Sequence, residues 1–127
     1  MRTERPARDL HVTSDAAARG FAERLADPNF SIFYNADTLV VIYAKPMGAF
    51  VAADCWLAAE NLMLAACAMG LGTCCIGSAV PALNEAEVKA ELSVPADFTA
   101  VVPIVVGVPS GSPAAVPRRE PQILSWK

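Results

Sequence analysis

Residues 50–69 place the strongest constraint on the fold of this chain. The segment contains no proline or glycine and is rich in alanine, leucine and methionine, which favour helix. Its few polar residues include Asp54 and Asn61, which are seven apart and share a face, while Glu60 lies to one side. The rest of the circumference is apolar, a pattern typical of a buried helix. Gly70 follows and supplies the left-handed residue that ends such helices.

The composition of the chain indicates that its apolar surface, including that of this helix, is too large for one small core to bury. Of the 127 residues, 54% are hydrophobic and only 18% are charged, whereas globular domains average about 45–50% apolar residues. Such a chain has more apolar surface than one domain can bury, so a membrane or a partner subunit must cover the rest. Asp54 and Glu60 are costly in hydrocarbon, and no flanking charge asymmetry sets an orientation. We therefore expect a partner subunit and no membrane.

The first part of the chain predicts one helix and one strand. Residues 1–13 are charged and patternless, which indicates a flexible arm. A helix capped at Ser14 is expected to run to about residue 26, because Asp27-Pro28 stops it. Residues 39–44 form a β-branched run that predicts a strand buried on both faces.

The second part predicts another helix and another strand. Asn84 is a good N-cap for a short helix over residues 84–92. Residues 99–108 predict a second strand, in which Pro103 indicates an edge or bulge position. A linker and a polar tail follow from residue 110. The order of elements predicts an α/β or α+β layer structure.

Charge and cysteine usage exclude several classes of function. A net charge of −3 with scattered basic residues argues against nucleic acid as a partner. The N-terminus does not resemble a secretory signal, so we expect a cytoplasmic protein with reduced cysteines. The one histidine, His11, is far from all of the cysteines, so no zinc or other metal site is predicted. The cysteines are Cys55, Cys67, Cys74 and Cys75.

No side chain stands out as catalytic. Asp54 and Glu60 point in different directions on a helix, and Cys74-Cys75 has no basic neighbour to activate a thiol, so we expect both cysteines to be small buried residues. The glycines of residues 70–77 follow a helix, unlike those of a dinucleotide loop. That segment is either a helix stop with a buried turn or a loop that contacts a ligand. Any redox chemistry would therefore require a cofactor.

Several segments, in unbroken order between residues 21 and 127, resemble nitroreductase-family flavoproteins. The most specific feature is a long helix that ends in Gly70-Leu-Gly-Thr-Cys. The segments that carry the resemblance are Pro28–Ala44, Asp54–Gly77, Val88–Pro95, Val105–Pro109 and Arg118–Trp126.

The resemblance implies a fold, a cofactor and a reaction. The fold would be a three-layer α+β domain over residues 14–127, with the long central helix packed on a small sheet. Two subunits would intertwine through their long helices as a homodimer, with FMN at the interface. Hydride would pass from NADH or NADPH to FMN and then to a nitro compound, a quinone or a similar acceptor. By position, the turn beside the flavin ring would consist of Cys75, Ile76, Gly77 and Ser78, and Arg118 or Arg119 would hold the FMN phosphate.

The N-terminal segment departs from the family pattern. Nitroreductases open with Arg-Arg-Ser-x-Arg, and Arg2, Arg5 and Arg8 around Pro6 do not reproduce that spacing. The chain thus resembles a family member without its first third. The leading prediction is an FMN-dependent oxidoreductase with no catalytic side chain of its own. The alternatives are a remnant that dimerises without flavin and a module that binds another small ligand.

Overall fold

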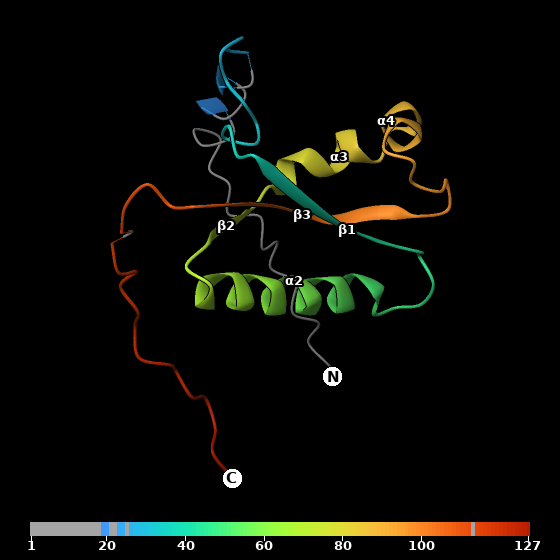
Figure 1. Cartoon of the computed structure of the whole chain (residues 1–127). Coiled ribbons are helices and arrows are strands. Elements are labelled where there is room, and N and C mark those ends of the chain that lie inside the picture. The colour runs from blue at the N-terminus through green and yellow to red at the C-terminus, as the bar shows by residue number, and fades with distance from the viewer. Residues whose placement is uncertain (1–18, 21–22, 25, 113) are drawn as a thin grey trace.

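A single three-stranded antiparallel sheet with helices on both faces forms the fold, in a computed structural model that describes residues 19–20, 23–24, 26–112 and 114–127. The strand order is β1-β3-β2, and both outer strands run antiparallel to β3. Helix α2 covers one face, whereas α3 and α4 lie on the other (Figure 1). This arrangement confirms the predicted α+β fold. The elements are β1 (Thr38–Ala44), α2 (Val51–Ala68), β2 (Gly72–Cys75), the 3-10 turn η1 (Gly77–Ala79), α3 (Val80–Leu83), α4 (Ala86–Glu91) and β3 (Thr99–Gly107).

Helix α2 confirms the prediction for residues 50–69 and ends as expected at a glycine. Gly70 has φ 78°, and its N–H donates to the Cys67 carbonyl at 3.0 Å. The Leu71 N–H donates to the Ala66 carbonyl at 2.9 Å. These two bonds satisfy carbonyls that the last helical turn would otherwise leave unpaired. Strand β2 can therefore begin directly after the helix, at Gly72.

Small side chains on α2 make the contact with the sheet. Cys55 and Ala59 are buried in one cluster with Val102 and Ile104 of β3, and Ala59 is only 1% exposed. Ala66 is buried further along the helix. Because alanine and cysteine are short, the helix can lie close to the central strand and exclude water from it.

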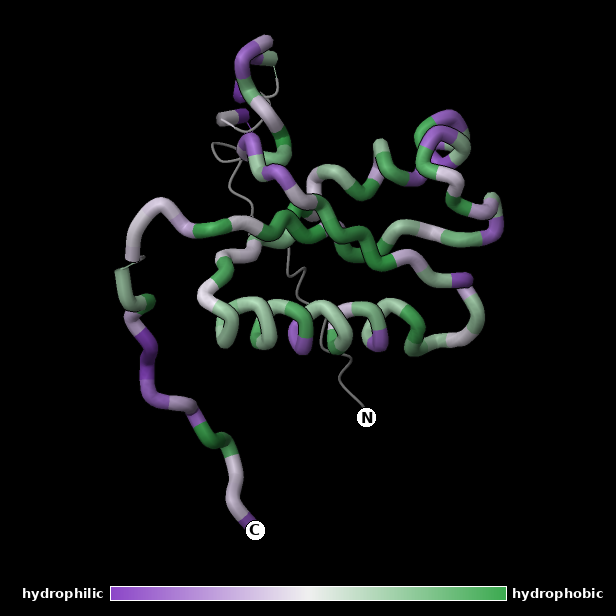
Figure 2. Tube along the Cα trace, viewed as in Figure 1, coloured by the Kyte–Doolittle hydropathy of each residue, from purple (hydrophilic) through white to green (hydrophobic). Residues whose placement is uncertain are grey.

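The opposite side of α2 remains open, which differs from the helix buried all round that the sequence predicts. Trp56, Leu57 and Leu64 are 50%, 65% and 60% exposed, and Figure 2 shows that the helix is hydrophobic along most of its length. By length and composition α2 could also cross a membrane. Helices that pack on a sheet, as α2 does, pass the same test, and Asp54 and Glu60 lie within this one. The outer face, on which exposed Asp54 and Asn61 lie beside Leu57 and Leu64, is thus left without a cover by the described residues of one chain.

The second apolar cluster lies on the other face of the sheet, beneath η1 and α3. It is built from buried residues of the turn, of α3 and of β3, with Val88 of α4 packed against it. Val41 and Tyr43 of β1 join this cluster, while Ile42 and Ala44 join the one beneath α2. Strand β1 therefore has apolar contacts on both faces, as its sequence predicts. The buried members are Ile76, Ala79, Leu83, Ala100 and Val105.

Strand β3 is the central strand, so the edge position expected from Pro103 is wrong. The Pro103 carbonyl accepts the Ile76 N–H at 2.9 Å, just beyond the end of β2. Since the N and C=O of a β residue point to the same side, the missing N–H of Pro103 faces that end and removes no bond to β1. The predicted bulge does occur nearby, because the register skips Val101 between Ile42 and Tyr43.

Asn84 does not cap a helix, contrary to the prediction. Helix α4 begins at Ala86, and Glu85 occupies the N-cap position without a side-chain hydrogen bond. The Asn84 side chain instead joins α3 to β3. Its amide nitrogen donates to the Val80 carbonyl at 3.0 Å and to the Ala100 carbonyl at 3.1 Å, and its oxygen accepts the Ala100 N–H at 2.8 Å.

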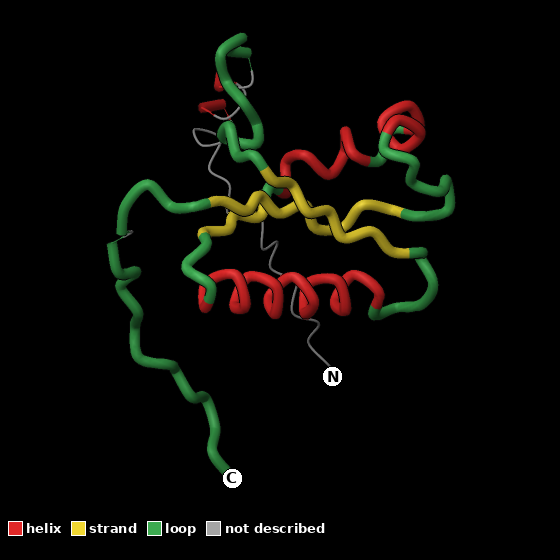
Figure 3. The backbone as a smooth tube through the Cα atoms, in the orientation of Figure 1, coloured by secondary structure: helices red, strands yellow, loops and turns green. Residues whose placement is uncertain are grey.

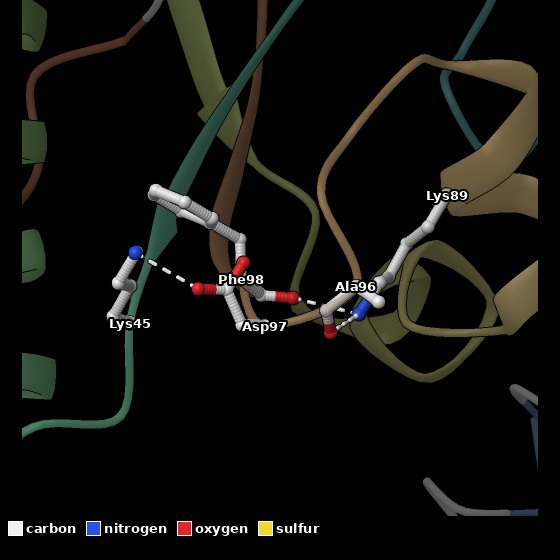
Figure 4. A network of polar contacts seen from close by, with 5 residues as sticks. All are labelled: Lys45, Lys89, Ala96, Asp97 and Phe98. Carbon is white, nitrogen blue, oxygen red and sulfur yellow. Dashed lines mark hydrogen bonds and ion pairs between the residues drawn. The ribbon is translucent and has the colours of Figure 1, made fainter.

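Two lysines fix the loop between α4 and β3 (Figure 4). Lys45 pairs with Asp97 at 2.8 Å and lies 5.2 Å from the centroid of the Phe98 ring. Lys89 donates to the Ala96 and Phe98 carbonyls at 2.6 and 2.8 Å. The hydrogen bond from Lys45 lowers the pKa of Asp97 below its usual value. The β1–α2 connection is thereby attached to the loop that precedes β3.

The two ends of the chain carry little regular structure. Of the predicted helix over residues 14–26, Arg19, Gly20, Glu23 and Arg24 are helical, and the remainder except Ala26 lies outside the described residues, as does the predicted arm over residues 1–13. The tail over residues 114–127 contains neither helix nor strand (Figure 3).

We predict that Asn84→Ala lowers the free energy of unfolding by about 2–3 kcal/mol, because the buried backbone of Ala100 loses its partners. Urea denaturation measures the change. Asn29→Ala is the matched control, since Asn29 is exposed, and it should change stability by less than about 0.5 kcal/mol. Equal effects of the two substitutions would contradict the bridging role.

Candidate functional site

The turn between β2 and α3 carries four of the residues that the sequence points to. Strand β2 ends where Cys75 lies opposite Ile104. Ile76 is buried, and its N–H is bound to Pro103 of the central strand. Gly77 and Ser78 are exposed. The central strand thus holds the start of the turn rigidly while its second half faces outward.

The exposed half of this turn presents unused backbone donors. The N–H groups of Gly77 and Ser78 have no acceptor among the described residues, whereas the Ala79 N–H donates to the Ile76 carbonyl at 2.9 Å. A side chain built on Gly77 would meet no atom within 4 Å. The surface beside the turn is therefore open, and a ligand with a polar edge could accept hydrogen bonds there.

The two adjacent cysteines differ in their surroundings. The Cys75 thiol donates to the Met63 sulfur at 3.6 Å. Burial raises the pKa of Cys75, and the charges of Cys74 and Glu60 raise it further. Cys74 is exposed and Cys75 is only partly buried, so the expectation that both are buried is wrong for Cys74 and holds only in part for Cys75. Successive strand residues face opposite sides, and only the side of Cys75 is covered by α2.

These surroundings do not favour thiol or metal chemistry. A thiol with a raised pKa is a poor nucleophile at neutral pH because little thiolate is present. In the described part of the chain, no group of three or more histidine, cysteine, aspartate or glutamate side chains is arranged to hold a metal ion. The turn can contribute hydrogen bonds and an apolar wall, and its four residues include no carboxylate or imidazole.

The structure does not bring Arg118 and Arg119 to the turn. Both lie exposed in the tail, and neither forms an ion pair with another described residue. Strand β3 ends at Gly107, which pairs with Gly72 at the start of β2, whereas the turn follows the end of β2. The tail then runs away from the sheet (Figure 1). Within one chain, the two predicted halves of the site are therefore separate.

Two cavities among the described residues lie away from the turn. One of about 410 Å³ opens between β1 and the first half of α2, and a second of about 290 Å³ shares Ala44 and Val51 with it. No sequence signal indicated them, because most of their lining residues are ordinary apolar ones. The first is lined by Ile42, Ala44, Lys45, Met47, Val51, Asp54, Cys55 and Ala58.

We predict that iodoacetamide modifies exposed Cys74 and Cys67 of the folded protein well before Cys75 and Cys55. Cys55 is buried, and the raised pKa of Cys75 leaves little thiolate to react. Peptide mapping by mass spectrometry after timed exposure measures the order, and the urea-unfolded protein serves as the control in which the four rates converge. Preferential modification of Cys75 would show that the turn activates its thiol.

A comparison with known proteins identifies the family of this chain. Residues 2–108 match the family model described as the nitroreductase family. A nitroreductase with bound FMN from Bacteroides fragilis is 25% identical with a TM-score of 0.67, and the match covers 88% of this chain and 63% of that one. This chain thus spans less than two-thirds of the Bacteroides protein. No curated protein matches it.

Two further structures share the fold. An FMN-dependent nitroreductase from Clostridium difficile is 20% identical, with a TM-score of 0.62 over 87% of this chain and 68% of that one. An oxidised iodotyrosine deiodinase bound to FMN and 3-iodo-L-tyrosine is also 20% identical, with a TM-score of 0.58 over 89% and 59%. The family match itself ends before Arg118 and Arg119. Because the family match spans most of the sequence, this chain belongs to the nitroreductase family.

Proposed function

We propose that this protein binds FMN and is a flavin-dependent oxidoreductase. Membership of the nitroreductase family supports the proposal, as do two related structures that contain FMN. The observation that carries it is the pair of unused N–H donors at Gly77 and Ser78, beside the open space at Gly77.

The turn fits the ring of a flavin. The polar edge of an isoalloxazine ring accepts hydrogen bonds from backbone N–H groups, which Gly77 and Ser78 offer. Bound FMN would supply the transfer of hydride, from NADH or NADPH to a nitro compound, quinone or similar acceptor. The protein has only to bind and orient the ring, which agrees with a turn that carries no carboxylate or imidazole and whose thiol, Cys75, has a raised pKa.

The phosphate of FMN requires a second group of residues. Arg118 and Arg119 can form charge-assisted hydrogen bonds to phosphate, but one chain does not place them beside its own turn. We therefore propose that a second copy contributes to the site in a homodimer. The outer face of α2 is the surface for that contact, because its apolar side chains Trp56, Leu57 and Leu64 are exposed to solvent in a single chain. We place this dimer in the cytoplasm.

The separation of the turn from the tail also favours a second candidate, a family remnant that dimerises without flavin. The two candidates share the fold and the exposed face of α2. They differ in whether this chain binds flavin at all. Titration with FMN and with riboflavin, which lacks the phosphate, distinguishes them, because the remnant binds neither flavin.

We predict that the double substitution Arg118→Ala and Arg119→Ala lowers the affinity for FMN by about ten- to hundredfold, as expected for lost charge-assisted hydrogen bonds. Riboflavin affinity should stay unchanged. Flavin fluorescence titration measures both. The double substitution Arg19→Ala and Arg24→Ala is the matched control, since it removes two exposed arginines of the described residues outside the tail.

Two results would contradict this assignment. Equal FMN affinity of the wild-type protein and the tail variant would show that the arginines do not hold the phosphate. A wild-type protein that binds neither FMN nor riboflavin would support the remnant without flavin.

A further inference from the structure

The outer face of α2 carries two lines of exposed residues, and successive members of each line are seven residues apart. Together the lines alternate at intervals of four and three residues, which is the spacing by which one helix packs along another. The apolar line is 75%, 65% and 60% exposed at Phe50, Leu57 and Leu64. These residues form the α2 seam, which in chain order consists of Phe50, Asp54, Leu57, Asn61, Leu64 and Ala68.

Asn61 lies at the middle of an exposed patch on this seam. On a helix, the neighbours of a residue on the same face are those three and four positions away. All four such neighbours of Asn61 are exposed. Two are leucines, which supply apolar surface, and two are alanines, which let a second helix approach closely. The four are Leu57, Ala58, Leu64 and Ala65.

This patch is complementary to itself when two helices cross antiparallel. The amide of Asn61 has a carbonyl acceptor and N–H donors, so two such amides at a two-fold axis can each donate to the other. Among the described residues, no side-chain hydrogen bond uses this amide. Leu57 of one copy then lies level with Leu64 of the other, and Ala58 lies level with Ala65, each to within about 1.5 Å along the helix. Leucines thus meet leucines on one side of the amide pair, and alanines meet alanines on the other.

The charge of Asp54 selects the antiparallel direction. In a parallel pair, Asp54 of each copy would lie opposite Asp54 of the other, and like charges that meet in an interface are costly. Helix α2 contains no lysine or arginine to neutralise them. In an antiparallel pair centred on Asn61, the two Asp54 residues are separated by about 21 Å along the helices.

We propose that the α2 helices of two copies cross antiparallel at Asn61, whose amide hydrogen-bonds to its counterpart on the two-fold axis and fixes the register of the homodimer. A single asparagine in an apolar seam selects one register, because any other register buries its amide without a partner. The free side of α2 points away from the sheet, so the crossing leaves the contact of α2 with β3 unchanged (Figure 1).

This pairing rests on the homodimer of the proposed function, and it adds the direction of the helices, their crossing point and the residue that selects them. Disulfide cross-linking tests the direction and the crossing point while Asn61 stays in place. The background protein carries Cys67→Ser and Cys74→Ser, which remove the two exposed thiols. Ala58→Cys and Ala65→Cys then each add one exposed thiol on the alanine side of the patch.

An equimolar mixture of the two cysteine variants should form a covalent dimer on mild oxidation, as read by non-reducing electrophoresis, because residues 58 and 65 of different copies lie level. Neither variant should cross-link alone. Its two thiols lie about 9 Å apart for residue 58 and about 12 Å apart for residue 65, whereas a disulfide needs Cα atoms within about 7 Å. A parallel pair would instead cross-link each variant with itself.

The role of Asn61 is tested by Asn61→Leu in the same mixture. Sedimentation velocity should show a dimer at least as strong as before, because burying an amide costs more than burying a leucine. The yield of the covalent dimer should nevertheless fall at least about threefold, because the register is no longer fixed. Asn29→Leu, at an exposed asparagine outside α2, is the matched control and should leave the yield unchanged.

Three results would overturn the pairing and leave the homodimer standing. One is a dimeric background protein whose mixed variants do not cross-link. Another is cross-linking of each variant alone as efficiently as in the mixture. The third is a yield that Asn61→Leu lowers no more than Asn29→Leu does. A background protein that sediments as a monomer at every concentration would instead remove the homodimer of the proposed function, and this pairing with it.

Discussion

The close contact between α2 and β3 determines most of this structure. Ala59 and its small neighbours on the helix lie against Val102 and Ile104, which are fully buried. Leu62 and Met63 of the helix also pack against this cluster, whereas the bulky residues Leu57 and Leu64 are largely exposed. One chain thus has a well-packed inner face on α2 and an apolar outer face that one chain cannot cover.

The end of α2 sets the position of the candidate site. The backbone bonds at Gly70 and Leu71 stop the helix, so the chain turns directly into β2 and pairs with β3. Four residues later β2 ends, and the bond from Ile76 to Pro103 fixes the start of the next turn. Backbone hydrogen bonds therefore set the position of the N–H donors of Gly77 and Ser78.

Local patterns predicted the elements that depend on local sequence, and missed those that depend on distant partners. The long helix, its glycine end and both apolar strands followed from composition and period. Strand β2 did not, because four residues become a strand only by pairing with β3. Asn84 has good capping chemistry, but hydrogen bonds to Ala100 use its side chain. The turn was singled out by family resemblance, whereas no local pattern places Arg118, which lies exposed in the tail.

Our central claim is that FMN binds where a second copy, packed through the outer face of α2, completes the site. Sedimentation velocity followed by flavin absorbance tests it most directly, with the wild-type protein and Leu64→Arg each mixed with FMN. We predict that flavin sediments with the wild-type protein and stays behind when Leu64→Arg sediments. Flavin that travels with Leu64→Arg at the wild-type ratio would contradict the claim, because the site would then be complete without the α2 contact.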